Sequence, residues 1–341
     1  MSKPTLKKIA ERLNLSVGTV SKAIKDYPDI SDKTKEKVKA VVEELSYKPN
    51  KFAQNLRNQE SKIIGLIIPQ IVHHFFSNIV LGVTEAAEKK GYLVIVLEST
   101  ESYETEMKHL DLLIERHVDG LLLSLADNTI KYNHITEIID QGVPIVLYDK
   151  ISKSFDCHKV VIDDKKAAYN ATKYLIDSGC KKIAHVRGPL KPQTTVDRFL
   201  GYKDALKDHH ISFDKSIVFE SEKISFDDGK EIAHRIKKNK NIDGVFAFTD
   251  LLASGILIGL VQEGVKIPEE ISVMGFSNWR LTKMTSPSLS TVNQCGYEMG
   301  QKAFELLYEE IIAKKTNTKL KHKTIEIPTE LVIRNSTKKP A

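Results

Sequence analysis

Apolar residues recur at two different spacings along the chain, and the spacing changes near residue 62. Before that point the apolar positions lie three and four residues apart, which is the repeat of an amphipathic helix. Thr5, Ser16 and Ser31 each precede one of these repeats, and side chains of this kind cap helix N-termini. The segment therefore predicts three short helices.

Beyond residue 62, apolar runs of strand length alternate with amphipathic stretches of helix length. Such alternation is typical of parallel sheets covered by helices on both faces. HVDGLLLS at 117–124 resembles NIDGVFAFT at 241–249, so two similar lobes with a cleft between them are expected. A late helix at 295–313 precedes two closing strands, KTIEIP and TELVIR. The strand-like runs are 63–69, 92–98, 119–124, 143–149, 159–164, 181–186, 244–249 and 271–276.

These patterns predict an α/β protein with an all-α head and a two-lobed body of doubly wound parallel sheets. The expected parts are a helical head at 1–49, a hinge helix and linker at 50–61, and a body at 62–336. Within the body we expect an N-lobe of about 62–162 and 294–322, and a C-lobe of about 163–291 and 323–336.

The net charge of +6 is concentrated in the first fifth of the chain. Residues 1–62 contain 14 Lys and Arg against 8 Asp and Glu, whereas the other 279 residues contain 37 of each. Binding of a polyanion to the N-terminal segment explains this segregation better than solubility does. No apolar run is long enough for a membrane span, and no apolar signal region follows the basic start MSKPTLKK, so a cytoplasmic protein without a membrane partner is expected. Three scattered cysteines favour a reducing compartment.

The second predicted helix, within NLSVGTVSKAI at 14–24, turns small polar residues and one cation outward. Small side chains permit close approach to a DNA groove, a lysine can reach a guanine edge or a phosphate, and hydroxyls can donate to phosphate oxygens. With the helix before it, this pattern indicates a helix-turn-helix. An ordinary solvated helical hairpin is the alternative. The outward residues are Val17, Gly18, Thr19, Ser21 and Lys22.

The segment NKFAQNLR at 50–57 is too short to be a stable helix alone in water. It is either a flexible linker or a segment that folds when two copies pair on DNA. In the second case Leu56 is an apolar wedge between base pairs in the minor groove.

Several stretches resemble the lactose-repressor (LacI/GalR) family of bacterial transcription regulators, in the family's order and across nearly the whole chain. They are TLKKIAERLNLSVGTVSKAI, YKPNKFAQNL, IVLYD, RFLGY and PSLSTVNQ. The resemblance implies a helix-turn-helix head, a hinge helix and a body like a periplasmic sugar-binding protein. It places Val17, Gly18 and Lys22 at base-reading positions and Leu56 at the intercalating position. The expected DNA-binding residues are Thr5, Ser16, Val17, Gly18, Thr19, Ser21, Lys22, Asn50, Ala53, Gln54 and Leu56.

Ligands of open α/β sheets bind beyond the carboxyl ends of the strands. Carboxylates, a guanidinium and aromatic rings at those ends suit a polyhydroxyl ligand. The alternatives are structural: Asp149 and Asp250 could cap the helices after them, and Arg198 could pair with Asp197 or Asp204. From the strand ends and the resemblance together, the expected effector-binding residues are Phe75, Phe76, Ser124, Asp149, Arg198, Ile224, Thr249, Asp250, Ser277 and Gln294.

Ser277 stands where many members of the family have an acidic residue. A carboxylate acceptor is therefore missing at that position, and the effector could differ from simple hexoses and pentoses. The site residues that the resemblance implies by itself are Phe75, Phe76, Asp149, Arg198, Thr249 and Gln294.

The expected function is sequence-specific regulation of transcription, as a repressor whose operator affinity is switched by a small effector, a sugar. The expected partners are a palindromic double-stranded DNA operator, the effector and a second copy of the chain in a homodimer. No enzymatic activity is expected, because GFSNW at 275–279 lacks the closing glycine of a nucleophile elbow. No cofactor or metal is expected, because there is no Gly-rich phosphate loop and the adjacent pairs His73-His74 and His209-His210 do not converge on a metal. Two alternatives remain: the same DNA-binding role with a protein co-repressor, and a solute-binding protein without DNA function.

Overall fold

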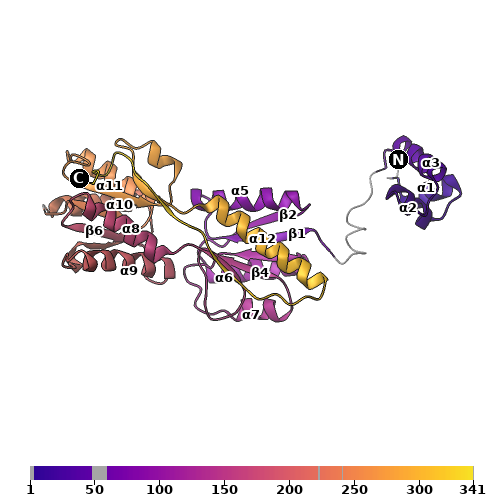
Figure 1. Cartoon of the computed structure of the whole chain (residues 1–341), viewed down its shortest axis with the longest axis horizontal. Helices are drawn as coiled ribbons and strands as arrows, with labels where there is room; N and C mark the ends of the chain where they lie inside the picture. The colour runs from indigo at the N-terminus through magenta and orange to yellow at the C-terminus, as the bar shows by residue number, and fades with distance from the viewer. Residues whose placement is uncertain (1–3, 48–59, 222, 240, 341) are drawn as a thin grey trace. The chain divides into compact units, whose positions relative to one another are not determined.

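The computed structural model describes residues 4–47, 60–221, 223–239 and 241–340 (Figure 1). The chain forms two compact units, Met1–Ser61 and Lys62–Ala341. The first unit contains α1 (Leu6–Leu13), α2 (Val17–Ile24) and α3 (Asp32–Glu44), as the apolar repeats predict. Its small core consists of Ile9, Ala10, Val20, Ala23, Val38 and Val41.

Hydroxyl side chains precede all three helices of the head, but only two of them cap the backbone. The Thr5 hydroxyl accepts a hydrogen bond from the backbone of α1 at 3.3 Å, and the Ser16 hydroxyl accepts one from the backbone of α2 at 3.0 Å. The Ser31 hydroxyl instead lies 2.9 Å from the Thr34 hydroxyl and accepts no backbone N–H. Ser31 therefore marks the start of α3 without forming the predicted cap.

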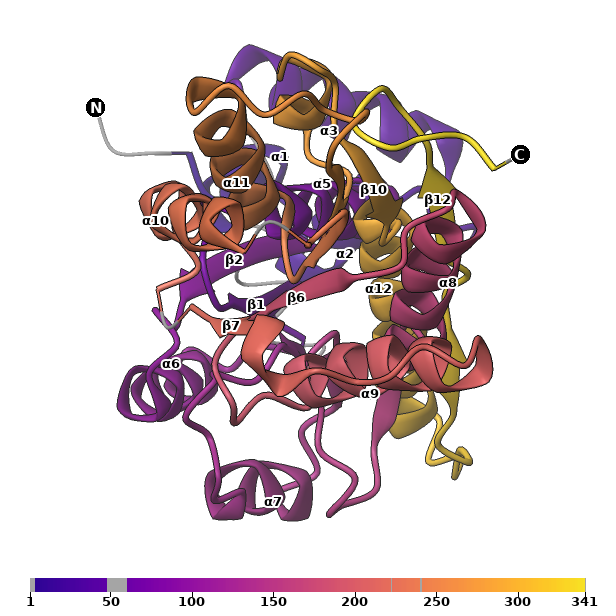
Figure 2. The ribbon, with the colours of Figure 1, turned by 90° about the vertical axis from the view of Figure 1, so that its left-hand side faces the viewer.

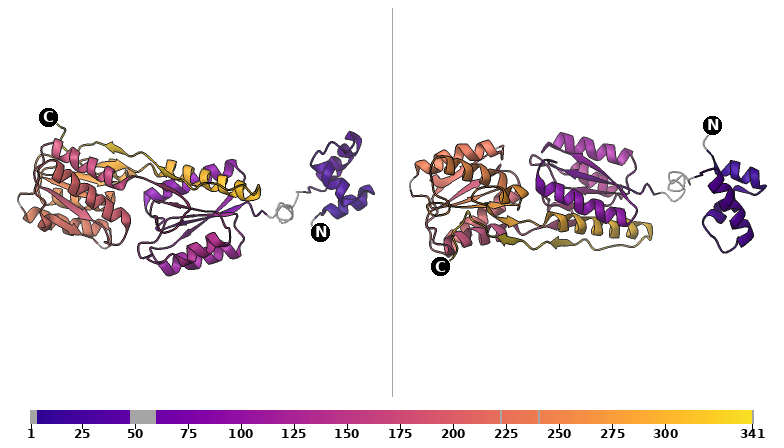
Figure 3. Two further views of the ribbon diagram at one scale, coloured as in Figure 1. Left: turned by 60° about the horizontal axis from the view of Figure 1, so that its bottom comes forward. Right: turned by 90° about the horizontal axis from the view of Figure 1, so that it is seen from above.

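The second unit is built on two six-stranded sheets, one in each lobe (Figure 3). The first sheet has the order β11-β5-β4-β3-β1-β2, and its described pairings are parallel. Its strands are β1 (Ile63–Ile68), β2 (Leu93–Glu98), β3 (Gly120–Leu123), β4 (Ile145–Tyr148), β5 (His158–Val161) and β11 (Thr324–Glu326). The helices of this lobe are α5 (His74–Lys89), α6 (Tyr103–Glu115), α7 (Asn133–Asp140) and α12 (Gly296–Lys315).

The second sheet has the order β12-β10-β9-β8-β6-β7, and Figure 2 shows helices on both of its faces. Its strands are β6 (Ile183–Arg187), β7 (Val218–Glu220), β8 (Gly244–Ala247), β9 (Ser272–Phe276), β10 (Ser290–Asn293) and β12 (Glu330–Val332). Its helices are α8 (Asp164–Asp177), α9 (Gln193–Asp208), α10 (Phe226–Lys238) and α11 (Asp250–Gln262), with short 3-10 turns η1 (Lys215–Ile217) and η2 (Arg280–Lys283).

Each sheet buries both faces, which explains why its strands are continuous apolar runs. Along β1, Ile64, Leu66 and Ile68 pack in the core beneath α5 and α12, whereas Ile67 packs in the separate core beneath α6 and α7. This alternation is the two-residue period of a strand applied to a sheet with helices on both sides.

Helix α12 comes from the far end of the chain and packs tightly on α5. A Cβ atom added to Gly82 would lie 2.2 Å from the Tyr297 carbonyl oxygen, and one added to Gly300 would lie 2.3 Å from the Ile79 carbonyl oxygen. Only glycine permits so close a crossing. The first lobe is therefore completed by a helix that follows the whole second lobe in sequence.

The fold class is confirmed: two lobes of parallel sheet with helices, and a separate helical head. Three details differ from the expectation. Strand β11 pairs with β5 in the first sheet, so the assignment of 323–336 to the C-lobe is wrong for this strand. Strand β12 runs antiparallel to β10, although parallel sheets were predicted. Strands β7 and β10 were not predicted from the sequence.

Candidate functional site

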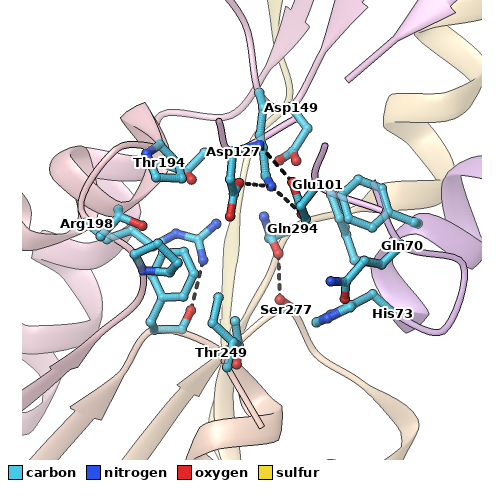
Figure 4. A pocket seen from close by; sticks show the side chains of 18 of the residues that line it. Gln70, His73, Glu101, Asp127, Asp149, Thr194, Arg198, Thr249, Ser277 and Gln294 are labelled. Carbon is cyan, nitrogen blue, oxygen red and sulfur yellow. Dashed lines mark hydrogen bonds and ion pairs between the residues drawn. The ribbon is translucent and has the colours of Figure 1, made fainter. Parts of the chain in front are cut away.

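A cavity of about 360 Å³ lies between the lobes of the body (Figure 4). Its walls are the segments that follow β1 to β4 in the first lobe and β6 to β10 in the second. The cavity is therefore placed where parallel sheets direct ligands, beyond the carboxyl ends of their strands. The lining residues are Gln70, His73, Phe75, Phe76, Glu101, Asp127, Asp149, Lys150, Pro189, Pro192, Thr194, Thr195, Arg198, Lys223, Ile224, Phe248, Thr249, Ser277 and Gln294.

Eight of the ten predicted effector residues line this cavity, and Ser124 and Asp250 do not. Ser124 is fully buried. Asp250 is also fully buried, where its carboxylate accepts hydrogen bonds from Trp279 N at 2.8 Å and from the Thr291 hydroxyl at 2.5 Å. The prediction for Asp250 is wrong because the carboxylate joins the β9 and β10 strand ends, and the cap of α11 is Thr249.

Arg198 lies on the second turn of α9 and is 4% exposed. Its Nε donates to Asp164 Oδ1 at 2.7 Å and its Nη1 donates to the Phe248 carbonyl oxygen at 2.8 Å. The guanidinium also lies 3.7 Å from the centre of the Phe276 ring. The predicted alternative partners are wrong, since Asp164 is the partner, yet the guanidinium still faces the cavity with unused N–H donors.

Four charged side chains form the opposite wall, from the first lobe. Lys150 Nζ lies 2.7 Å from Glu101 Oε1 and also contacts Asp127. Asp149, which precedes it, has a positive φ of 57° and turns its carboxylate into the cavity. Burial raises the pKa of Asp149 to about 6, with repulsion from Asp164 adding to the effect. Burial likewise raises the pKa of Glu101 to about 7, against the lowering influence of Lys150.

Hydrogen-bonding groups without charge complete the lining. The Ser277 hydroxyl donates to Gln294 Oε1 at 2.6 Å, and Gln294 lies on the chain segment that passes from β10 to α12. Ser277 has a φ of 119° and Ile224 has a φ of 49°. Positive φ angles are unusual for residues other than glycine. Both expected aromatic residues, Phe75 and Phe76, lie at the start of α5.

His73 and Trp279 bring the two lobes together at the cavity. The His73 ring, from the segment before α5, lies 5.0 Å from the Trp279 ring, from the segment after β9, in an edge-to-face arrangement. Burial lowers the pKa of His73 to about 4, so this imidazole is neutral near pH 7. Trp279 is the only tryptophan of the chain, and it contacts a residue that lines the cavity, His73.

Several polar lining residues that follow strand ends by two to four positions were not predicted from the sequence. Glu101 follows β2, Asp127 follows β3 and Lys150 follows β4. The strand-end rule could have found them if it had been applied beyond the first residue of each loop. The missed residues that line the cavity are Gln70, His73, Glu101, Asp127, Lys150, Pro189, Pro192, Thr194, Thr195, Lys223 and Phe248.

In the head, helix α2 presents the residues that the sequence singled out. Val17 is 46% exposed, and Gly18 and Lys22 are also exposed, while Thr19 and Ser21 are half-buried. The predicted hinge residues lie outside the part of the chain that the structure describes; they are Asn50, Ala53, Gln54 and Leu56.

A second cluster, in the first lobe, has the composition of a metal site. Among the described residues, His158, Glu310 and His322 bring potential ligand atoms within 4.8 Å of one another. However, the Lys323 backbone N–H donates to His158 Nδ1 at 3.1 Å, so a neutral ring carries its proton on Nε2. A nitrogen that carries a proton cannot bind a metal, so this arrangement does not favour a metal ion.

None of the helices in the described ranges is long and apolar enough to cross a bilayer.

Comparison with known proteins places both units in one family. Residues 5–50 match the model of bacterial regulatory proteins of the lacI family, and residues 61–335 match that of periplasmic binding proteins and the sugar-binding domain of the LacI family. The chain is 32% identical over 337 residues to the HTH-type transcriptional repressor PurR of Vibrio atlanticus (strain LGP32), with 98% of each chain covered.

Two solved structures share the architecture. The transcriptional regulator CelR in complex with cellobiose matches with a TM-score of 0.73 and 26% identity, over 98% of this chain and 99% of that one. The lac repressor dimer bound to operator and the anti-inducer ONPF matches with a TM-score of 0.85 and 22% identity, over 98% and 99%.

The match of residues 5–50 overturns the alternative of a solute-binding protein without DNA function. Relatives that cover nearly the full length of the chain are named as transcriptional regulators, and several of them as repressors. The chain belongs to the LacI family of bacterial regulatory proteins and is a DNA-binding transcriptional regulator, not an enzyme.

Proposed function

We propose that the protein is a repressor that binds a palindromic operator as a homodimer and changes its operator affinity when a small polyhydroxyl ligand occupies the cavity between the lobes. The observation that carries this proposal is the cavity itself. Residues of both lobes line it, so a ligand that contacts both walls stabilises one relative placement of the lobes over others.

The lining supports a sugar-like ligand. Carboxylate, guanidinium, hydroxyl and amide groups supply fixed donors and acceptors, and Phe75, Phe76 and Phe248 supply apolar faces. CelR, a regulator with the same architecture, has been solved with cellobiose. We propose that the eight predicted residues at the cavity contact the effector, with Asp149 and Arg198 on opposite walls.

For DNA, we propose that α2 enters the major groove with Val17, Gly18 and Lys22 toward the base edges and Thr19 and Ser21 toward phosphates. The exposure of Val17, Gly18 and Lys22 supports this orientation. Thr5 and Ser16 cap the two helices of the motif, so their contribution is to fix the N-termini that face the phosphate backbone. Two heads in a dimer then read two half-sites, and the lac repressor, which shares the fold, has been solved as a dimer on its operator.

The proposal is tested in two steps with the full chain. Selection from a random duplex pool should enrich a two-fold symmetric site, and sedimentation should give two chains per duplex. Titration of a sugar panel, followed by Trp279 fluorescence, should then identify a ligand that changes the affinity for the selected duplex. Enrichment of no symmetric site, or one chain per duplex, would contradict the DNA-binding part.

A further inference from the structure

We propose that the effector carries a primary amine on a polyhydroxyl body, as an amino sugar does, and that Asp149 receives its ammonium group. This inference rests on the proposed function, because it names the ligand class of the same cavity. A neutral sugar would be held through hydroxyl groups alone.

The first-lobe wall has more carboxylates than cations. Glu101, Asp127 and Asp149 all line the cavity, and Lys150 is the one lysine or arginine of the described first-lobe lining, in which His73 is neutral near pH 7. Its ammonium contacts Glu101 at 2.7 Å and also contacts Asp127. One ammonium therefore serves two carboxylates, and both of these contacts are to carboxylates other than Asp149.

Asp149 differs from the other enclosed aspartates in having no partner. Asp250 accepts hydrogen bonds from Trp279 N and Thr291, and Asp164 accepts one from Arg198. Among the described residues, none donates to the side-chain oxygens of Asp149. Enclosure without donors is costly for a carboxylate, and the raised pKa of Asp149, about 6, reflects that cost.

In the described residues, the cations of the second-lobe wall are not bonded to Asp149. Arg198 is paired with Asp164 at 2.7 Å. Lys223 is exposed, so solvent and salt screen its charge. Lys150 and Arg198 lie close enough to lower the pKa of Asp149, but each is bonded to other carboxylates and neither donates to Asp149.

A ligand amine fits Asp149 better than a hydroxyl group does. An ammonium supplies three donors and a positive charge, whereas a hydroxyl supplies one donor and no charge. The remaining lining suits the rest of a sugar, because Gln70, Thr194 and Thr249 offer amide and hydroxyl groups and Phe75 offers an apolar face. Binding of the amine at Asp149 would also favour ionisation of this carboxylate.

The test uses matched ligand triplets and the full chain. Glucosamine, galactosamine and mannosamine are each compared with the N-acetyl derivative and with the parent sugar, by calorimetry and Trp279 fluorescence at pH 7. At least one amine should bind about tenfold or more tightly than both of its neutral counterparts, as charge-assisted hydrogen bonds imply. The preference should fall at pH 5, where Asp149 is protonated.

Asp149→Asn removes the charge at nearly constant shape and should reduce the amine preference to near one. Asp140→Asn is the matched control, because Asp140 is an exposed carboxylate at the end of α7, outside the cavity lining. Equal or tighter binding of the neutral sugars, an unchanged preference in Asp149→Asn, or no binding by any amine would overturn the inference. The proposed function fails separately, if ligands that occupy the cavity leave operator affinity unchanged.

Discussion

The packing of the head does not require a glycine at position 18. A Cβ atom added there would meet only the Ser16 hydroxyl, at an ordinary 3.6 Å. Gly18→Ala should therefore stabilise α2 by about 0.5–1 kcal/mol, because alanine loses less backbone entropy in a helix. If α2 enters the major groove, the same methyl group should weaken operator binding.

The two effects are measured by thermal melting and by fluorescence anisotropy of a labelled operator. A higher melting temperature together with weaker operator binding is the expected result. Tight operator binding by Gly18→Ala would show that the backbone at this position does not approach the bases.

The Asp29 carboxylate competes with DNA for the Lys22 ammonium. Its Nζ lies 2.5 Å from Asp29 Oδ2, and both side chains are about half exposed. Binding of Lys22 to a base edge or a phosphate requires that this pair opens, so Asp29→Asn should raise DNA affinity. The control is Asp32→Asn, which removes the same charge from a carboxylate that lies 3.8 Å from Lys35. If both variants raised DNA affinity equally, the increase would come from the net charge of the head and not from release of Lys22.

The same residue type, placed after a strand in each lobe, has different roles in the two lobes. Asp149 and Asp250 both follow buried strands, and the sequence predicted both as effector residues. Asp149 lines the cavity, whereas Asp250 is tied to Trp279 and Thr291. The partners of Asp250 lie 29 and 41 positions away along the chain, and no local pattern indicates them.

At the scale of elements, the continuous apolar runs were predicted well because strands buried on both faces leave few polar positions. The missed strands are short or polar: β7 has three residues, and β10 reads STVN. Strand β11 was assigned to the wrong lobe, since the choice of a sheet for three residues depends on tertiary pairing with β5. The residue types of a three-residue strand do not indicate which sheet it joins.

The C-terminal half of α12 contains a carboxylate that should make stability depend on pH. Burial raises the pKa of Glu310 from 4.5 to about 7, although nearby His322 opposes the shift. A carboxyl group with a raised folded-state pKa binds its proton more tightly in the folded protein than in the unfolded chain. Its contribution to stability is thus fully present below pH 4.5 and is lost as the pH rises to about 7.

Glu310→Gln should remove this contribution to the pH dependence. Chemical denaturation of both proteins between pH 5 and 8 measures it, and the variant should gain stability relative to the parent as the pH rises. Asp149 and Glu101 have raised pKa values too, so the difference between the two proteins is the informative quantity. Parallel stability curves would show that Glu310 is already ionised at low pH in the folded state.

At the scale of the whole molecule, the proposed switch joins a DNA-binding head to a body that binds a ligand between its lobes. The chain crosses between the two sheets of the body three times, after β5, β10 and β11, and Gln294, on the second of these crossings, lines the cavity. A ligand bound to both walls can act on DNA only by favouring one lobe placement, and the coupling must be reciprocal. DNA should therefore change the affinity for ligand by the same factor.

The most direct test is one titration with two signals. A ligand identified through Trp279 fluorescence is added to the protein and a labelled operator, while tryptophan emission and DNA anisotropy are recorded on the same sample. We predict that operator affinity changes as the cavity fills and that the change reaches its plateau when the tryptophan signal does. A cavity that saturates while operator affinity stays constant would contradict this prediction.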